Sequence, residues 1–184
     1  MSTNVLVLGN PILREKSEAV IDFVDKRNKE DFNNLKKELD YFRRENGFGR
    51  GIAGIQIGIK KRIIALNLGK GSFIIVNPEI IRYSNETFTM WDDCMSFKDL
   101  IVRVKRFRSI DIIYSNESGE RQEWFDVKQD VSELLQHEID HLDGILAIDR
   151  AITSTDIIYK SEYVKYEDYY NKKADYTIKP TINK

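Results

Sequence analysis

The sequence predicts an α+β fold, in which antiparallel and mixed β-sheets surround a central helix and an amphipathic helix lies nearer the N-terminus. Two observations indicate this class. Apolar residues recur at helical spacing in two separate stretches, residues 29–45 and 130–144. Between these stretches, residues 63–125 contain short β-branched and aromatic runs separated by turn-forming clusters, a pattern typical of strands.

The first helix is expected over residues 29–45 and is amphipathic. Its apolar positions step by three, four and three residues among charged neighbours, which gives the helix one apolar face. These positions are Phe32, Leu35, Leu39 and Phe42. Asn46 and Gly47 tolerate the left-handed conformation that ends helices, so we expect the helix to end there.

Five short runs are predicted as strands. The alternation of apolar and basic residues over 102–105 indicates that one sheet face is buried and the other is exposed to solvent. The runs are Ile63–Leu66, Phe73–Val76, Ile101–Val104, Ile110–Tyr114 and Trp124–Phe125. A second helix follows, with Asp130 predicted as its N-cap, Glu133 as the capping-box partner and Gly144 as the residue that ends it.

Size, charge and cysteine content narrow the class of protein. A chain of 184 residues corresponds to a single domain, or to a domain with a tail. Its formal net charge of −1 gives no basic field that would attract nucleic acid or an anionic membrane surface. A single cysteine cannot form an internal disulfide. Because no signal peptide and no apolar run of about 18 residues is visible, we expect a cytoplasmic protein without membrane contact.

The second predicted helix carries a His-Glu-x-x-His motif. His137 and His141 are the only two histidines in the chain, and a spacing of four residues places both imidazoles on one helix face, where they can share a metal ion. Glu138 lies beside them and is placed to accept a proton from a metal-bound water. The alternative is that both are ordinary surface histidines on a charged helix.

A catalytic site of this type needs a third protein ligand. Cys94, the only cysteine, is one candidate, although a lone cysteine is often just a small buried apolar residue. A downstream carboxylate, Glu162 or Glu167, is the other, and would make the chain similar to a zinc metallopeptidase. The residues alone leave this choice open.

The glycine-rich stretch from Gly47 to Gly58 contains a Gly-x-Gly-x-x-Gly pattern at residues 49–54. A dinucleotide site requires a strand before this pattern and a helix after it, whereas here a helix precedes and a strand follows. The remaining interpretations are a mobile hinge, or a loop whose backbone lies close to a ligand. Gln56, at its end, offers an amide donor to a nearby site.

Together these motifs resemble the peptide deformylase family. Three family motifs occur in order, and the third is matched throughout: residues 49–56 for the Gly-x-Gly-φ-Ala-Ala-x-Gln loop, 92–96 for Glu-Gly-Cys-Leu-Ser, and 136–144 for Gln-His-Glu-x-Asp-His-Leu-x-Gly. The similarity extends over about residues 4–150. It implies a catalytic domain over 1–150 and a Tyr- and Lys-rich C-terminal extension over 151–184.

The resemblance implies a metal-dependent hydrolase that removes the N-formyl group from the initiator methionine of nascent polypeptides, with N-formylmethionyl peptides and chains at the ribosome as partners. The metal ligands would be Cys94, His137 and His141, and Glu138 the general base. The implied metal is one divalent ion, Fe²⁺ in many members, with Zn²⁺, Ni²⁺ or Co²⁺ also accommodated.

The remaining site residues also follow from the resemblance. The side-chain amide of Gln56 and the backbone N–H of Met95 would stabilise the developing oxyanion. Gly49, Arg50 and Gly51 would line the substrate-binding site. An extended substrate backbone would lie against Gly51, like an added strand.

The chain departs from the family pattern at several positions. Arg50 replaces an apolar residue, Gly54 an alanine, Asp92-Asp93 a Glu-Gly pair and Lys98-Asp99 a Pro-Gly pair. These changes leave two alternatives: a related hydrolase that acts on another N-blocked substrate, and a metal-binding protein without deformylase activity.

Overall fold

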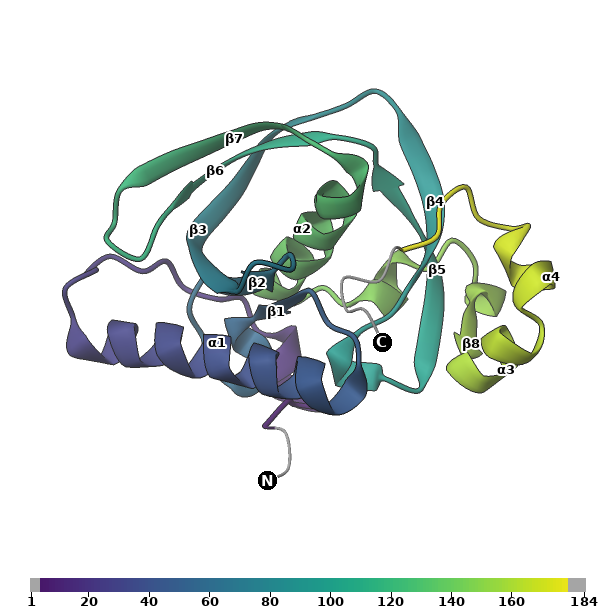
Figure 1. Ribbon diagram of the computed structural model, residues 1–184, viewed down its shortest axis with the longest axis horizontal. Coiled ribbons are helices and arrows are strands. Elements are labelled where there is room, and N and C mark those ends of the chain that lie inside the picture. Colours follow the sequence, from purple (N-terminus) through teal and green to yellow (C-terminus); the bar gives the residue numbers. More distant parts are fainter. Residues whose placement is uncertain (1–3, 179–184) are drawn as a thin grey trace.

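The computed structural model of the chain describes residues 4–178 and has an α+β fold (Figure 1). The α-helices are α1 (Lys26–Asn46), α2 (Gln129–Leu142), α3 (Lys160–Lys165) and α4 (Glu167–Asn171). The strands are β1 (Gly51–Ala53), β2 (Ile63–Asn67), β3 (Ser72–Tyr83), β4 (Thr87–Asp92), β5 (Leu100–Phe107), β6 (Ile110–Ser115), β7 (Arg121–Val127) and β8 (Ile157–Tyr159). Short 3₁₀ helices include η1 (Pro11–Arg14), η2 (Gly54–Ile57), η3 (Met95–Phe97), η4 (Ala147–Arg150) and η5 (Ser154–Asp156).

The strands form two sheets. One has five strands in the order β1-β2-β3-β6-β7, and the other has three in the order β4-β5-β8. Each strand pair in residues 4–178 is antiparallel, so the expectation of mixed sheets was wrong. Among the described residues, parallel pairing is limited to isolated bridges, between Glu18 and Lys61 and between Met90 and Tyr176.

The five-stranded sheet separates two helices. Helix α1 packs on β1, β2 and β3 from one face, while α2 packs on β1 and β2 from the other, as Figure 1 shows. Strand β2 illustrates the reason: Ile63 and Ala65 join the apolar cluster with α1, whereas Ile64 and Leu66 join the cluster with α2. Successive strand side chains point to opposite faces, so a wholly apolar strand is buried on both.

Helix α1 confirms the predicted amphipathic helix and begins three residues earlier. Asp25 caps it by accepting a hydrogen bond of 2.7 Å from the Arg27 N–H. Gly47 ends it in the left-handed conformation, with a φ of 73°. The apolar face predicted from the spacing is buried against the sheet.

The predicted N-cap of α2 was wrong. The helix begins at Gln129, so Asp130 lies within its first turn, and the N-cap residue Lys128 makes no side-chain capping bond. Glu133 is not a capping-box partner, because its carboxylate pairs with Arg50. The C-terminal expectation holds: Gly144 follows the C-cap Asp143 with a φ of 74°.

Three strands of the structure were not predicted from the sequence. β1 lies within the glycine-rich stretch that was expected to be a loop, and it exists because Gly51 to Ala53 pair with β2 in register Gly51–Leu66. Glycine has low strand propensity, so only this tertiary pairing defines the strand. β4 and β8 are the other two, and both pair with β5.

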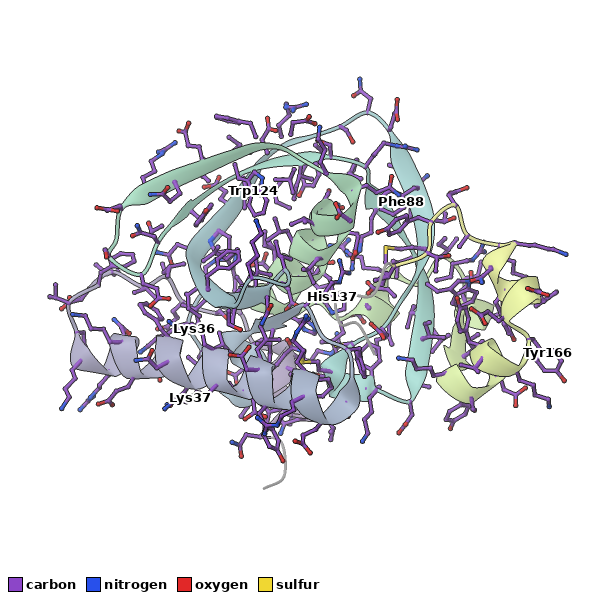
Figure 2. All side chains as sticks on the ribbon, in the orientation of Figure 1. Lys36, Lys37, Phe88, Trp124, His137 and Tyr166 are labelled. Carbon is purple, nitrogen blue, oxygen red and sulfur yellow. The ribbon has the colours of Figure 1, made fainter. Side chains whose placement is uncertain are left out.

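Part of the segment after residue 150 packs on the three-stranded sheet. β8 pairs with β5, and the Trp91 side chain on β4 contacts Tyr163 and Tyr170, with ring centroids 5.8 and 5.3 Å away. Tyr166, by contrast, is exposed and points outward (Figure 2). The last six residues of the expected extension, 179–184, lie outside the described residues. Within 4–178, every helix is too short or too polar to span a membrane.

Replacing Gly144 by alanine should destabilise the fold more than the same change at Gly58. Both glycines have positive φ, which costs alanine about 1–2 kcal/mol. A Cβ at Gly144 would also lie 2.5 Å from the backbone oxygen of Arg14, whereas one at Gly58 would meet nothing within 4 Å. We expect a further loss of about 1–3 kcal/mol for Gly144→Ala in urea unfolding. Equal losses in the two variants would contradict this packing of η1 against the end of α2.

Candidate metal centre

Three potential ligand atoms converge inside the protein. Helix α2 presents His137 and His141, one turn apart, and the segment between β4 and η3 presents Cys94. Nε2 of His141 lies 3.1 Å from Nε2 of His137 and 3.3 Å from Sγ of Cys94, and all three atoms lie within 4.8 Å of one another. The three side chains are buried, and Figure 2 shows His137 deep within the molecule.

Asp92, the last residue of β4, fixes the orientation of His137. Its Oδ2 lies 2.9 Å from Nδ1 of His137 and accepts a hydrogen bond of 3.1 Å from Nη2 of Arg106. With Nδ1 directed at the carboxylate, Nε2 is turned towards Cys94 and His141. Metal-binding histidines commonly have such a carboxylate partner on the other ring nitrogen.

Arg106 joins Asp92 to helix α2. Its Nη1 donates to Asp140 at 2.6 Å, and Asp140 also accepts from Arg150 at 2.7 Å. The Arg106 and Asp92 side chains are only 4 and 5% exposed.

Burial and this network set the protonation of the site. Burial acts to raise the pKa of Asp92, but His137 and Arg106 outweigh it and lower that pKa to about 2. Burial lowers the pKa of His137, yet Asp92 raises it well above its ordinary value. The pKa of His141 is lowered, first by burial and then by His137. Asp92 is therefore ionised at neutral pH.

Glu138 follows His137 on α2 and is buried. Burial raises the pKa of its carboxyl group to about 7, although His137 opposes the shift. Its Oε2 has no hydrogen-bond partner within residues 4–178. Gly51 on β1 makes room for it, since a Cβ there would lie 2.7 Å from Oε1 of Glu138. Such a carboxyl group can exchange a proton near neutral pH.

Gln56 points its amide towards Cys94. The Ala53 N–H donates to Oε1 of Gln56 at 2.9 Å, which turns Nε2 towards Ser96 Oγ at 3.2 Å and Cys94 Sγ at 3.6 Å. Met95 is the first residue of η3, where a helix does not use the backbone N–H. The Met95 side chain lies against Gly49, because a Cβ there would be 2.5 Å from its Cε.

Three of the charged residues that depart from the family pattern, Arg50, Asp92 and Asp93, are paired. Arg50 turns towards α2, where Nη2 pairs with Glu133 and Nη1 donates to the Asp130 carbonyl at 2.5 Å. Asp92 is buried in the network above. Asp93 pairs at 2.8 Å with Lys160 on α3.

The residues fit a divalent metal ion. A thiolate and two imidazoles are a ligand set that zinc and similar metals bind in catalytic sites. Cys94, His137 and His141 form the one group of this kind within residues 4–178. Glu162 and Glu167, the alternative third ligands, are exposed on α3 and α4 and lie outside that group.

Sequence reasoning missed the partnership of Asp92 with His137 and the burial of Glu133. Only the fold brings Asp92 to His137, because 45 residues separate them. A signal for Glu133 was present, since it precedes His137 by four residues and therefore shares its helix face.

Comparisons with known proteins indicate the same family as the sequence motifs. A sequence model of the family described as polypeptide deformylase matches residues 2–156. A peptide deformylase of Heliobacterium modesticaldum is 37% identical over 150 residues, covering 79% of this chain and 91% of that protein. One of Pseudothermotoga lettingae is 32% identical over 180 residues, covering 98 and 100%. The crystal structure of the Thermotoga maritima peptide deformylase has a TM-score of 0.74 and 31% identity, covering 81% of this chain and 97% of that one.

Replacing Arg106 by methionine should destabilise the protein by about 3–5 kcal/mol, because it leaves buried carboxylates without their cation. Arg150→Met is the matched control: Arg150 also pairs with Asp140, but its side chain is 47% exposed, and we expect a loss of about 0–1 kcal/mol. Urea unfolding of both variants measures the difference. Similar losses would show that the buried network does not hold β5 to α2.

Proposed function

The chain belongs to the peptide deformylase family, whose members remove the formyl group from nascent peptides, and we propose that here Cys94, His137 and His141 bind the divalent metal ion of that reaction. The observation that carries the proposal is the convergence of these three ligand atoms beside the buried Glu138 carboxyl group. A bound divalent ion supplies positive charge that acidifies a water molecule and polarises the formyl oxygen. We propose Fe²⁺ as the native ion; Zn²⁺, Ni²⁺ or Co²⁺ would suit the same ligands.

Glu138 would be the general base and then the general acid. Its carboxylate takes a proton from the attacking water, and the same proton passes to the amine that leaves as formate is released. The pKa of about 7 suits both steps, because the group can hold or lose a proton near neutral pH. Gly51 has no side chain, so the backbone of β1 leaves room for the Glu138 carboxyl group.

Two donors would stabilise the oxyanion that forms on the formyl oxygen. The hydrogen bond from Ala53 N–H holds the Gln56 amide so that its Nε2 faces the site, and the Met95 N–H at the start of η3 is the second donor. Removal of one such donor typically costs about 100- to 1,000-fold in turnover.

The substrate proposed is an N-formylmethionyl peptide, met at the ribosome in the cytoplasm as the chain emerges. β1 is an edge strand, so its free edge can accept an extended peptide as an added strand. Gly51 begins β1 and Gly49 lies two residues before it, and neither has a side chain that would keep a peptide backbone away.

Cys94→Ser should abolish stoichiometric metal binding, because a serine hydroxyl is a poor ligand compared with a thiolate. Glu162→Gln is the control and should keep full metal content, since Glu162 is exposed on α3. Metal analysis of the purified, folded variants gives the result. Retention of metal by Cys94→Ser with loss from Glu162→Gln would instead support the zinc peptidase arrangement.

Glu138→Gln should retain the metal ion but lower formate release from formyl-Met-Ala-Ser by about 100- to 10,000-fold, the usual contribution of a general base. The amide keeps the shape of the side chain but cannot accept the proton. The assay uses anaerobically prepared, Fe²⁺-loaded protein of measured metal content. Turnover within fivefold of the unchanged chain would contradict the role given to Glu138.

A further inference from the structure

The ion pair between Arg50 and Glu133 lies one helical turn before His137, on the face of α2 that carries both histidines. Glu133, His137 and His141 follow one another at four-residue intervals, so all three side chains project from the same side of the helix. Four residues correspond to a rise of about 6 Å. Arg50 reaches this position from the segment that precedes β1, which packs against α2.

The pair lies close to a group proposed to act in the reaction. Gly51, the neighbour of Arg50, lies against Glu138, because a Cβ there would be 2.7 Å from its Oε1. The side chains of Arg50 and Glu133 are only 11 and 2% exposed. The pair therefore forms part of the buried wall beside the site and is not a surface contact.

The first residue of a substrate can reach this wall. A formyl carbon at the metal centre is separated from the first Cα by one C–N and one N–Cα bond, a span of about 2.5 Å. The first side chain begins at that Cα, and a methionine side chain is long enough to span the helical turn between His137 and Glu133. Arg50 lies between the two glycines and directly precedes β1, and its side chain turns towards α2.

Such a wall differs chemically from an apolar one. Arginine carries five N–H donors, and the bonds to Glu133 and to the Asp130 carbonyl use two of them. An amide or hydroxyl group on the substrate can therefore find a partner here, which an apolar wall would not provide. A purely apolar side chain gains less binding free energy at this wall, because it covers charged groups without replacing their hydration.

We propose that the Arg50–Glu133 ion pair is a specificity determinant, which lets the enzyme accept formylated peptides whose first side chain ends in a hydrogen-bonding group, such as an amide, nearly as well as apolar ones. This inference rests on the proposed deformylase function. It explains the arginine at position 50, where the family has an apolar residue, by substrate choice. The proposed roles of the metal ligands and Glu138 are unchanged.

The test compares two formyl peptides of similar size, formyl-norleucyl-Ala-Ser and formyl-glutaminyl-Ala-Ser, on the Fe²⁺-loaded protein. We expect the kcat/KM ratio of norleucine to glutamine to be below tenfold. An apolar pocket would give about 100-fold, because it would bury the glutamine amide without a partner. A ratio of tenfold or more in the unchanged chain would overturn the proposal.

The double variant Arg50→Leu with Glu133→Leu tests the pair itself. It removes both charges together, a change that buried pairs often tolerate without loss of stability. Its norleucine-to-glutamine ratio should be at least tenfold higher than that of the unchanged chain. The control, Lys36→Leu with Glu117→Leu, removes a 2.8 Å ion pair between α1 and the β6–β7 connection and should leave the ratio as it was.

Failure of this inference can be distinguished from failure of the proposed function. An unchanged ratio in a folded, active double variant overturns the role of the ion pair alone. If the double variant does not fold, the ratio in the unchanged chain decides. Absence of formate release from formyl-methionyl, formyl-norleucyl and formyl-glutaminyl peptides alike, in protein with full metal content, overturns the proposed function and this inference with it.

Discussion

The buried carboxylate of Asp92 connects the three-stranded sheet to the candidate metal centre. It ends β4, contacts Nδ1 of His137 on α2, and is paired with Arg106 on β5. If Asp92 were displaced, His137 would lose the partner that turns its Nε2 towards Cys94 and His141. Because Arg106 also binds Asp140, the same cation holds the three-stranded sheet to the helix. The geometry of the site thus depends on charges that stabilise one another out of contact with water.

Two edge strands, one from each sheet, shape the site. β1 is the outer strand of one sheet and brings Gly51 against Glu138, while β4 is the outer strand of the other and ends two residues before Cys94. Helix α2 lies between them, and its apolar residues Leu135 and Ile139 pack into the core under the five-stranded sheet. A rigid helix therefore carries two proposed ligands and the proposed base, and only Cys94 comes from a connecting segment.

Local patterns in the sequence predicted the parts of this structure that arise locally. The spacing of His137, Glu138 and His141 within a helix needs no knowledge of distant residues, and Gly47 and Gly144 end their helices as expected. The strand at Gly51–Ala53 could not be predicted, because it depends on pairing with residues 64–66. Asp130 and Glu133 matched a capping box in sequence, but Arg50 pairs with the Glu133 carboxylate, and the helix starts one residue before Asp130. Such tertiary pairing overrides local propensity.

The central claim is that Cys94, His137 and His141 hold one divalent ion beside Glu138. Anomalous diffraction at the absorption edge of the bound metal, from crystals of the Fe²⁺- or Zn²⁺-loaded protein, tests it most directly. The account predicts one strong peak, about 2.3 Å from Sγ of Cys94 and about 2.0–2.1 Å from both histidine Nε2 atoms in the zinc form. A peak elsewhere in the molecule, or none at this position in protein that contains stoichiometric metal, would contradict it.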